Sequence, residues 1–132
     1  STPCGTLYPY TTLFRSVGHA IEQASGYALP HGRAVARGML WEAAIGEALG
    51  VTAAGTEAHL AGWLAGAELP GTRGEIDPVD TVERMRLDKK VRGGVPRIVL
   101  LERIGAVARD EGAWSHTLDA DELEGWLERL AG

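Results

Sequence analysis

Apolar residues recur at helical spacing along most of this chain, and glycine or proline interrupts the pattern at several points. The longest such segment runs from residue 31 or 32 to 49, and Gly50 is placed to end it. Gly32, Gly38 and Gly46 lie inside it, and each costs a helix about 1 kcal/mol relative to alanine. We therefore expect another helix, or less commonly a ligand, to approach closely at these glycines. The predicted apolar stripe consists of Val35, Met39, Leu40, Ala43 and Leu49.

A shorter helix precedes the long one. Residues 17–23 have the pattern of the last turns of a helix, and Gly26 is well placed to stop it. Gly26 and Pro30 then mark a tight connection, with His19 before it and His31 after it. Two imidazoles so placed could reach one point, as metal binding or proton transfer requires. The alternative is a helical hairpin whose histidines share no role, and local spacing alone favours it.

Three further helices are expected downstream. Thr56 and Glu57 provide a plausible N-cap and first-turn acid for a helix to about residue 67. Asp77-Pro78 begins another that runs through Arg86, and Asp119 opens the last one as part of a capping box. Their apolar positions at helical spacing are Leu60, Trp63, Leu64 and Ala67, then Val79, Val82 and Met85, and finally Leu123, Trp126, Leu127 and Leu130.

One stretch is β-branched and apolar without a helical period. Residues 97–101 come after the helix-breaking pair Gly93-Gly94 and form the best strand candidate in the chain. Residues 105–108 could form its hairpin partner. The pattern therefore predicts a mainly α domain with a small β-hairpin near residues 97–108.

The first 16 residues differ in character from the rest of the chain. They contain two prolines, three aromatic residues and no acidic residue, and they have no helical or alternating period. Residues 6–16 also resemble the translation of a common sequencing-adapter oligonucleotide, departing from it only at Tyr8. We therefore expect residues 1–16 to be a non-native or disordered segment, and residues 17–132 to form the domain. A natural irregular N-terminal arm is the alternative.

Composition narrows the functional class. A length of 132 residues with 45% hydrophobic and 23% charged residues fits one globular domain. A net charge of −5 argues against a general nucleic-acid-binding surface. The single cysteine, Cys4, excludes an internal disulfide and fits a reducing compartment. Without a membrane-length apolar run or a signal-peptide pattern, the sequence predicts a cytoplasmic protein that binds neither membrane nor nucleic acid.

Two further groups could carry chemistry. Glu22 lies three residues after His19 on the same helix face and could orient that imidazole, although such a residue is by default an ordinary surface glutamate. Lys89 and Lys90 lie beside a glycine-rich turn, where lysine charges can hold phosphate or carboxylate. A solvated helix C-terminus is the alternative, and charge alone favours it. The remaining histidines are expected to face solvent: His59 and His116.

Four blocks of the chain are more informative together than separately. They are Gly18-His19-Ala20-Ile21-Glu22, His31-Gly32-x-Ala34-Val35-x-x-Gly38-Met39, Asp88-Lys89-Lys90 and Ile98-Val99-Leu100-Leu101-x-x-Ile104-Gly105. In order and spacing, across residues 17–132, the chain resembles the C-terminal domain of 3-dehydroquinate synthase. The resemblance implies a lyase of the shikimate pathway, which makes chorismate and the aromatic amino acids. That enzyme converts 3-deoxy-arabino-heptulosonate 7-phosphate to 3-dehydroquinate and phosphate, using NAD and zinc or cobalt.

The resemblance also implies roles for particular residues. His31 matches the family's metal-ligand histidine, and His19 matches an active-site histidine near the substrate. The pair Lys89 and Lys90 matches the lysine block that contacts the substrate phosphate, with Lys90 the favoured register. No residue of this chain matches a cofactor-binding position, because the NAD-binding domain belongs to sequence upstream. The resemblance further implies a sugar-phosphate substrate and a homodimer of the full-length protein.

Two positions depart from the family pattern. Arg15 stands where the family has a second metal-ligand histidine, and Arg33 replaces the usual glutamate after His31-Gly32. The third ligand, a glutamate, belongs to the upstream sequence. With one of three ligands retained, we expect this chain alone to be inactive and to bind neither NAD nor metal tightly.

Two other functional hypotheses remain open. Another sugar-phosphate cyclase, of the 2-deoxy-scyllo-inosose or valiolone synthase type, would share the scaffold and both histidines. Glycerol dehydrogenases are more distant relatives, and the blocks at residues 88–90 and 98–105 argue against them. A non-enzymatic helical interaction domain is the alternative from a different class, and it would tolerate replacement of both His19 and His31.

Overall fold

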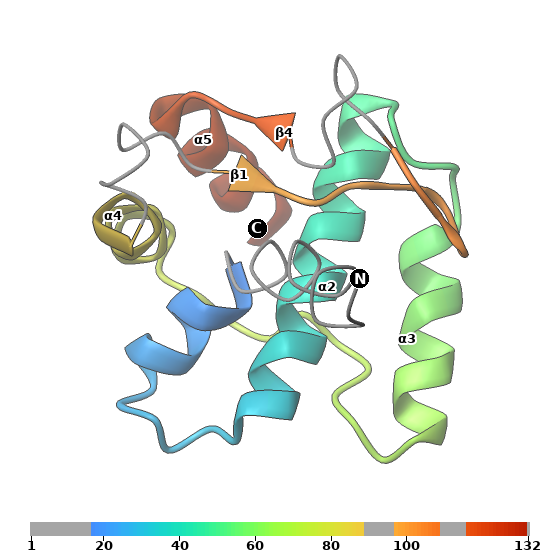
Figure 1. Ribbon diagram of the computed structural model, residues 1–132, viewed down its shortest axis with the longest axis horizontal. Coiled ribbons are helices and arrows are strands. Elements are labelled where there is room, and N and C mark those ends of the chain that lie inside the picture. Colours follow the sequence, from blue (N-terminus) through green and yellow to red (C-terminus); the bar gives the residue numbers. More distant parts are fainter. Residues whose placement is uncertain (1–16, 89–96, 109–115, 132) are drawn as a thin grey trace, which may run out of the picture.

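The computed structural model describes residues 17–88, 97–108 and 116–131, and within them the fold is mainly helical. A helix over residues 17–24 is followed by α2 (His31–Leu49), α3 (Thr56–Gly66), α4 (Pro78–Asp88) and α5 (Ala120–Ala131). In Figure 1, α2 runs through the middle of the molecule, with α3 on one side and α4 and α5 on the other. The predicted segment 1–16 lies outside the described residues, so its non-native character stays a prediction.

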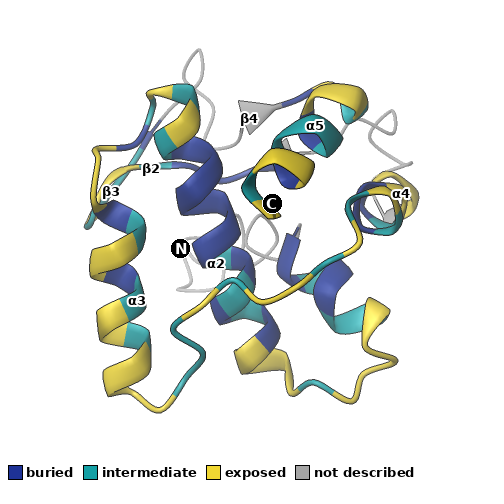
Figure 2. Ribbon diagram, turned by 180° about the vertical axis from the view of Figure 1, so that it is seen from behind, coloured by how far each residue is buried: buried dark blue, intermediate teal, exposed yellow. Residues whose placement is uncertain are grey.

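The middle of α2 is buried on every side, because α3, α5 and the strand β2 (Leu101–Arg103) all pack against it (Figure 2). Trp41 and Ile45 are fully buried there, although the predicted stripe did not include them. Within that stripe, Leu40 and Ala43 are buried as predicted, whereas three members are only half-buried: Val35, Met39 and Leu49. A helix that is packed on all sides has no single apolar face. An apolar pattern that assumes one buried face therefore predicts its buried residues poorly.

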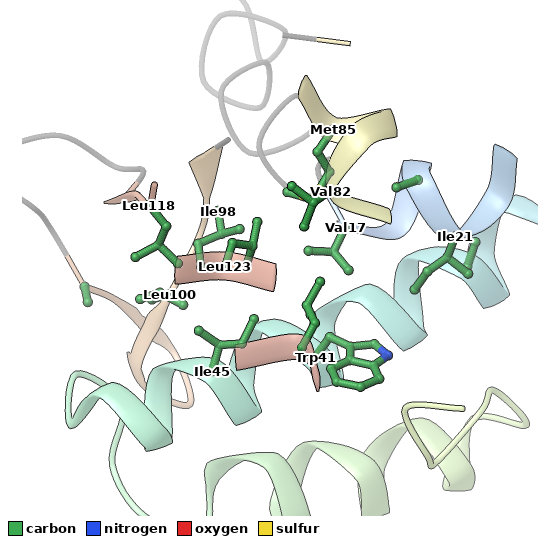
Figure 3. Close-up of a cluster of buried hydrophobic side chains, with 14 residues drawn as sticks. Val17, Ile21, Trp41, Ile45, Val82, Met85, Ile98, Leu100, Leu118 and Leu123 are labelled. Atoms are coloured by element: carbon green, nitrogen blue, oxygen red, sulfur yellow. The ribbon is translucent and has the colours of Figure 1, made fainter. Parts of the chain in front are cut away.

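The hydrophobic core lies between α2 and the helices and strands that surround it. Side chains from the first helix, α2, α4, α5 and the β segments meet there, as Figure 3 shows. The largest fully buried members are Trp41, Leu40, Ile45, Met85, Ile98, Leu100, Leu123, Leu127 and Val17.

Glycine allows the first helix to cross α2 with the two backbones nearly touching. A Cβ added at Gly38 would lie 2.5 Å from the backbone nitrogen of Gly18, a distance that real Cβ atoms do not adopt. A Cβ added at Gly46 would lie 2.0 Å from Oγ1 of Thr52. The expected approach of another helix is therefore present at Gly38, whereas the close neighbour of Gly46 is a side chain from the loop that follows α2. Gly32 is exposed, with nothing within 4 Å of its added Cβ, so close packing does not explain that glycine.

The predicted buried face of α3 is mostly wrong. Of this helix, Thr56 and Leu60 are buried, whereas Trp63 is 58% exposed and Leu64 is half-buried. Thr56 is the first helical residue rather than the N-cap, a position that Gly55 occupies. The carboxylate of Glu47 on α2 instead accepts the exposed N–H groups at this helix start, at 3.0 Å from Gly55 and 2.7 Å from Glu57.

The strand segments form two separate antiparallel pairs in the described part of the chain. The strand β2 (Leu101–Arg103) pairs with β3 (Ala106–Val107), which is a hairpin inside the predicted range 97–108. However, β1 (Arg97–Ile98) pairs with β4 (His116–Thr117) instead of extending that hairpin. The predicted continuous strand over residues 97–101 is therefore divided between two pairings. None of the described helices is long and apolar enough to cross a membrane.

Candidate functional site

The two histidines that the sequence singles out meet at one carboxylate. Nδ1 of His31 lies 3.1 Å from Oε1 of Glu22, and Nδ1 of His19 lies 3.4 Å from the same oxygen. Nε2 of His19 also lies 3.2 Å from the side-chain amide nitrogen of Gln23. The structure therefore brings His19 and His31 together, with Glu22 between them, and a shared role of the two histidines stays a prediction. We call His19, Glu22 and His31 the histidine pair site.

A short turn with two left-handed residues brings His31 back to the first helix. Gly26 and Tyr27 both have positive φ, at 66° and 64°, which reverses the chain within a few residues. The hydroxyl of Ser25 donates to the carbonyl of Glu22 at 2.7 Å and accepts the N–H of Leu29 at 3.1 Å. Because α2 begins directly after this turn, its first residue lies beside the end of the preceding helix.

The histidines stabilise the charged form of Glu22. The hydrogen bond from His31 lowers the pKa of the Glu22 carboxyl below its ordinary value, and the bond from His19 acts in the same direction. Partial burial opposes this shift, since the Glu22 side chain is only 13% exposed. His19 is 23% exposed and His31 is 54% exposed, so the site opens toward solvent on the His31 side.

The other predicted site residues do not join this pair within the described part of the chain. Lys89 and Lys90 lie just beyond the end of α4 and outside the described residues, as does Arg15. Arg33 is exposed on the first turn of α2. His59 is exposed as expected, with its ring in edge contact with Trp63 at 4.9 Å between centroids. The side chain of His116 is outside the described set, so its solvent exposure stays a prediction.

The described residues do not form a complete metal site by themselves. Among them, no three His, Cys, Asp or Glu side chains gather closely enough to hold a metal ion. His31 could supply one donor, through the ring nitrogen that does not face Glu22. Two open cavities, of about 450 and 430 Å³, each include one α2 residue, Trp41 and Arg37 respectively, and neither is lined by His19 or His31.

Sequence reasoning missed a buried carboxyl on α2. Glu42 is only 3% exposed, and burial raises the pKa of its carboxyl well above the ordinary value. Backbone N–H groups of Val99 and Val17 act in the opposite direction, while Oε1 has no hydrogen-bond partner in the described structure. The helical spacing of apolar residues gave no sign that Glu42 is buried. It would have done so only if α2 had been expected to pack on several sides.

Solved structures share this fold. The chain is similar to a crystal structure of 2-deoxy-scyllo-inosose synthase, with a TM-score of 0.67 and 21% identity over 88% of this chain and 30% of that one. It is also similar to a 2-deoxy-scyllo-inosose synthase complexed with carbaglucose-6-phosphate, NAD+ and Co2+, with a TM-score of 0.70 and 19% identity over 89% of this chain and 32% of that one. At 19–21% identity this likeness shows the fold alone, which the chain shares with about a third of each of those structures.

Sequence comparison identifies the family to which the chain belongs. The family model for the 3-dehydroquinate synthase C-terminal domain matches residues 15–91, more than half of the chain. The 3-dehydroquinate synthase of Dehalococcoides mccartyi is 39% identical over 90 residues, which cover 68% of this chain and 25% of that protein. The 3-dehydroquinate synthase of Neisseria meningitidis is 39% identical over 97 residues, which cover 73% of this chain and 27% of that protein. This chain belongs to the 3-dehydroquinate synthase family, as a C-terminal domain spanning about a quarter of those curated relatives.

Proposed function

We propose that this chain is the substrate- and metal-binding helical part of a 3-dehydroquinate synthase. The full-length enzyme would convert 3-deoxy-arabino-heptulosonate 7-phosphate to 3-dehydroquinate and phosphate. The observation that carries the proposal is the meeting of His19 and His31 at Glu22, in a chain 39% identical to 3-dehydroquinate synthases. A cytoplasmic location and a homodimer of the full-length protein belong to the same proposal.

Each site residue receives a distinct role. His31 would donate to a divalent metal together with ligands from upstream sequence, and the metal would supply Lewis-acid polarisation of the substrate oxygen. His19, whose side chain is half-buried, would face the substrate. Lys89 and Lys90 come directly after α4 and would hold the substrate phosphate by charge. NAD would bind the upstream domain, so the isolated chain lacks both the hydride carrier and most of the metal ligands.

The principal competing proposal is another sugar-phosphate cyclase activity. The two similar solved structures are both 2-deoxy-scyllo-inosose synthases, but at 19–21% identity they support only the fold. The relatives at 39% identity are 3-dehydroquinate synthases, and this higher identity favours the heptulosonate phosphate as substrate. The proposal therefore commits to 3-dehydroquinate formation.

A chimeric enzyme tests the proposed substrate. Residues 17–132 would replace the corresponding C-terminal part of the Neisseria meningitidis relative, so that the position of Arg15 comes from the relative. We expect phosphate release from 3-deoxy-arabino-heptulosonate 7-phosphate and none from the substrates of the inosose and valiolone cyclases. Preference for one of those substrates would contradict the proposal. His31→Ala should abolish turnover, while His59→Ala, at an exposed histidine outside the site, should leave it unchanged.

The lysine pair gives a second test in the same chimera. We expect Lys90→Ala to lower kcat/KM by about 10- to 100-fold, the loss of one charge-assisted hydrogen bond, mainly through a higher KM. Lys89→Ala should have the smaller effect. If both variants retain the parental kcat/KM for the heptulosonate phosphate, the lysines do not bind the phosphate group.

A further inference from the structure

We propose that Glu22 is the positioning residue of the histidine pair site. One of its two carboxylate oxygens, Oε1, accepts a hydrogen bond from Nδ1 of His31 and another from Nδ1 of His19. One carboxylate would therefore fix the ring orientation and the proton position of both imidazoles at once. What the two rings do chemically rests on the proposed function, whereas the positioning role of Glu22 is argued from these hydrogen bonds.

The hydrogen bonds around His19 have a consistent direction. The side-chain amide nitrogen of Gln23 carries only N–H donors, so Nε2 of His19 accepts this bond. In the neutral ring the proton then lies on Nδ1, which donates to Glu22. His19 is thus held from both sides of its ring, by residues three and four positions along the same helix.

The same reasoning applies to His31 from the other side of the turn. Its Nδ1 donates to Glu22, so the proton of the neutral ring lies on Nδ1 and the lone pair on Nε2. Metal-binding histidines commonly donate their other N–H to a carboxylate, which sets the tautomer and raises the basicity of the ligand nitrogen. Because the His31 side chain is 54% exposed, packing alone does not fix its ring.

Burial makes Glu22 suited to hold both rings. Its side chain is 13% exposed, which limits competition from water for the shared oxygen. Its position three residues after His19 and nine before His31 places it where the helix and the turn converge. An alanine at this position would leave both Nδ1–H groups without their acceptor.

Ring nitrogen NMR of the 132-residue chain tests the proposal without metal, NAD or substrate. At a pH where the imidazoles are neutral, we expect Nδ1 of His19 and His31 to show protonated shifts and Nε2 to show unprotonated shifts. Glu22→Ala should move His31 toward the Nε2-protonated form and His19 much less, because Gln23 still donates to Nε2 of His19, and Glu22→Gln should have an intermediate effect. Glu128→Gln, an exposed α5 residue, should change neither.

The wild-type chain is informative even if Glu22→Ala fails to fold. Nε2-protonated rings in the wild-type chain would overturn the proposal, as would unchanged ring shifts of His31 in a folded Glu22→Ala variant. In the chimera, Glu22→Ala should also lower Co2+ affinity by about 10- to 100-fold in chelator competition, with Glu22→Gln in between. If the 132-residue wild-type chain shows the expected ring shifts but the chimera has no activity, the proposed function is refuted while the positioning role of Glu22 is retained.

Discussion

Glu22 and Glu42 lie on adjacent helices, yet their surroundings shift their carboxyl pKa values in opposite directions. Hydrogen bonds from His31 and His19 lower that of Glu22, so its contribution to stability is present above its ordinary pKa and is lost as the pH falls. Burial raises the pKa of Glu42, so the folded state prefers its protonated form. Stability should therefore fall as the pH rises from about 4.5 toward the raised pKa of Glu42.

Replacing Glu42 tests directly whether its ionisation lowers stability as the pH rises. Glu42→Gln keeps the size of the side chain and removes its ionisation. We therefore expect the midpoint temperature of thermal unfolding to rise at pH 8 and to change little at pH 4.5. Glu128→Gln, at an exposed position of α5, should show no such dependence on pH. If Glu42→Gln destabilised the chain more at pH 8 than at pH 4.5, the buried carboxyl would be ionised and well solvated in the folded protein.

At the level of single residues, the sequence revealed one half of the histidine pair site. The three-residue spacing predicted the contact between His19 and Glu22, because a helix brings such positions to one face. The contact of His31 with Glu22 depends on the positive φ of Tyr27, a conformation that a tyrosine rarely adopts. The partners of Glu42, Val17 and Val99, come from distant segments that helical spacing does not relate.

The crossing of the first helix over α2 determines where His19 lies. That crossing depends on Gly38, whose added Cβ would lie 2.5 Å from the backbone nitrogen of Gly18. Backbone atoms cannot move aside as a flexible side chain can. The position of the histidine pair site is therefore set by a contact between two helices that carry glycine at the same point.

Two glycines of the same helix provide a matched comparison. Gly38→Ala should destabilise the chain by about 1–3 kcal/mol through overpacking. Gly32→Ala should be neutral or stabilising by up to about 1 kcal/mol, since nothing lies within 4 Å of its added Cβ. Urea unfolding measures both. Equal effects of the two substitutions would mean that the close crossing does not exist in solution.

For whole elements, the sequence predicted which helices and strands occur better than it predicted how they pack against one another. The helices α2, α3, α4 and α5 begin and end close to the predicted residues, because caps, glycine and proline are local signals. The buried face of α3 was predicted wrongly, since Trp63 is mostly exposed to solvent. Which side of an apolar helix is covered depends on its neighbours. The pairing of β1 with β4 likewise joins segments that local pattern does not connect.

Across the whole molecule, Arg73 ties three helices together. Its guanidinium binds the carboxylate of Glu57 on α3 and the carbonyl of Leu130 on α5, and it lies 5.0 Å over the ring of Trp41 on α2. Its own carbonyl accepts N–H groups from Trp41 and Arg37, at 3.1 and 2.7 Å. The loop before α4 is thereby fixed against the central helix.

Loss of the Arg73 cation should lower the free energy of unfolding of the whole chain. Arg73→Met should lower the free energy of unfolding by about 1–2 kcal/mol, allowing for the partial exposure of the ion pair. Arg86→Met, which removes an exposed pair with Glu83, should cost no more than about 0.5 kcal/mol. Urea unfolding at low and moderate salt distinguishes the two. An Arg73 variant as stable as the Arg86 variant would show that the loop is held by other contacts.

The most direct measurement compares the isolated 132-residue chain with the chimera that supplies the upstream domain. Both would be incubated with 3-deoxy-arabino-heptulosonate 7-phosphate, NAD and Co2+, and 3-dehydroquinate would be quantified. We expect product from the chimera and none from the isolated chain, because under the proposed function the chain carries one part of a divided active site. A folded, NAD-binding chimera that forms no 3-dehydroquinate, or turnover by the isolated chain, would contradict the proposed division of the active site.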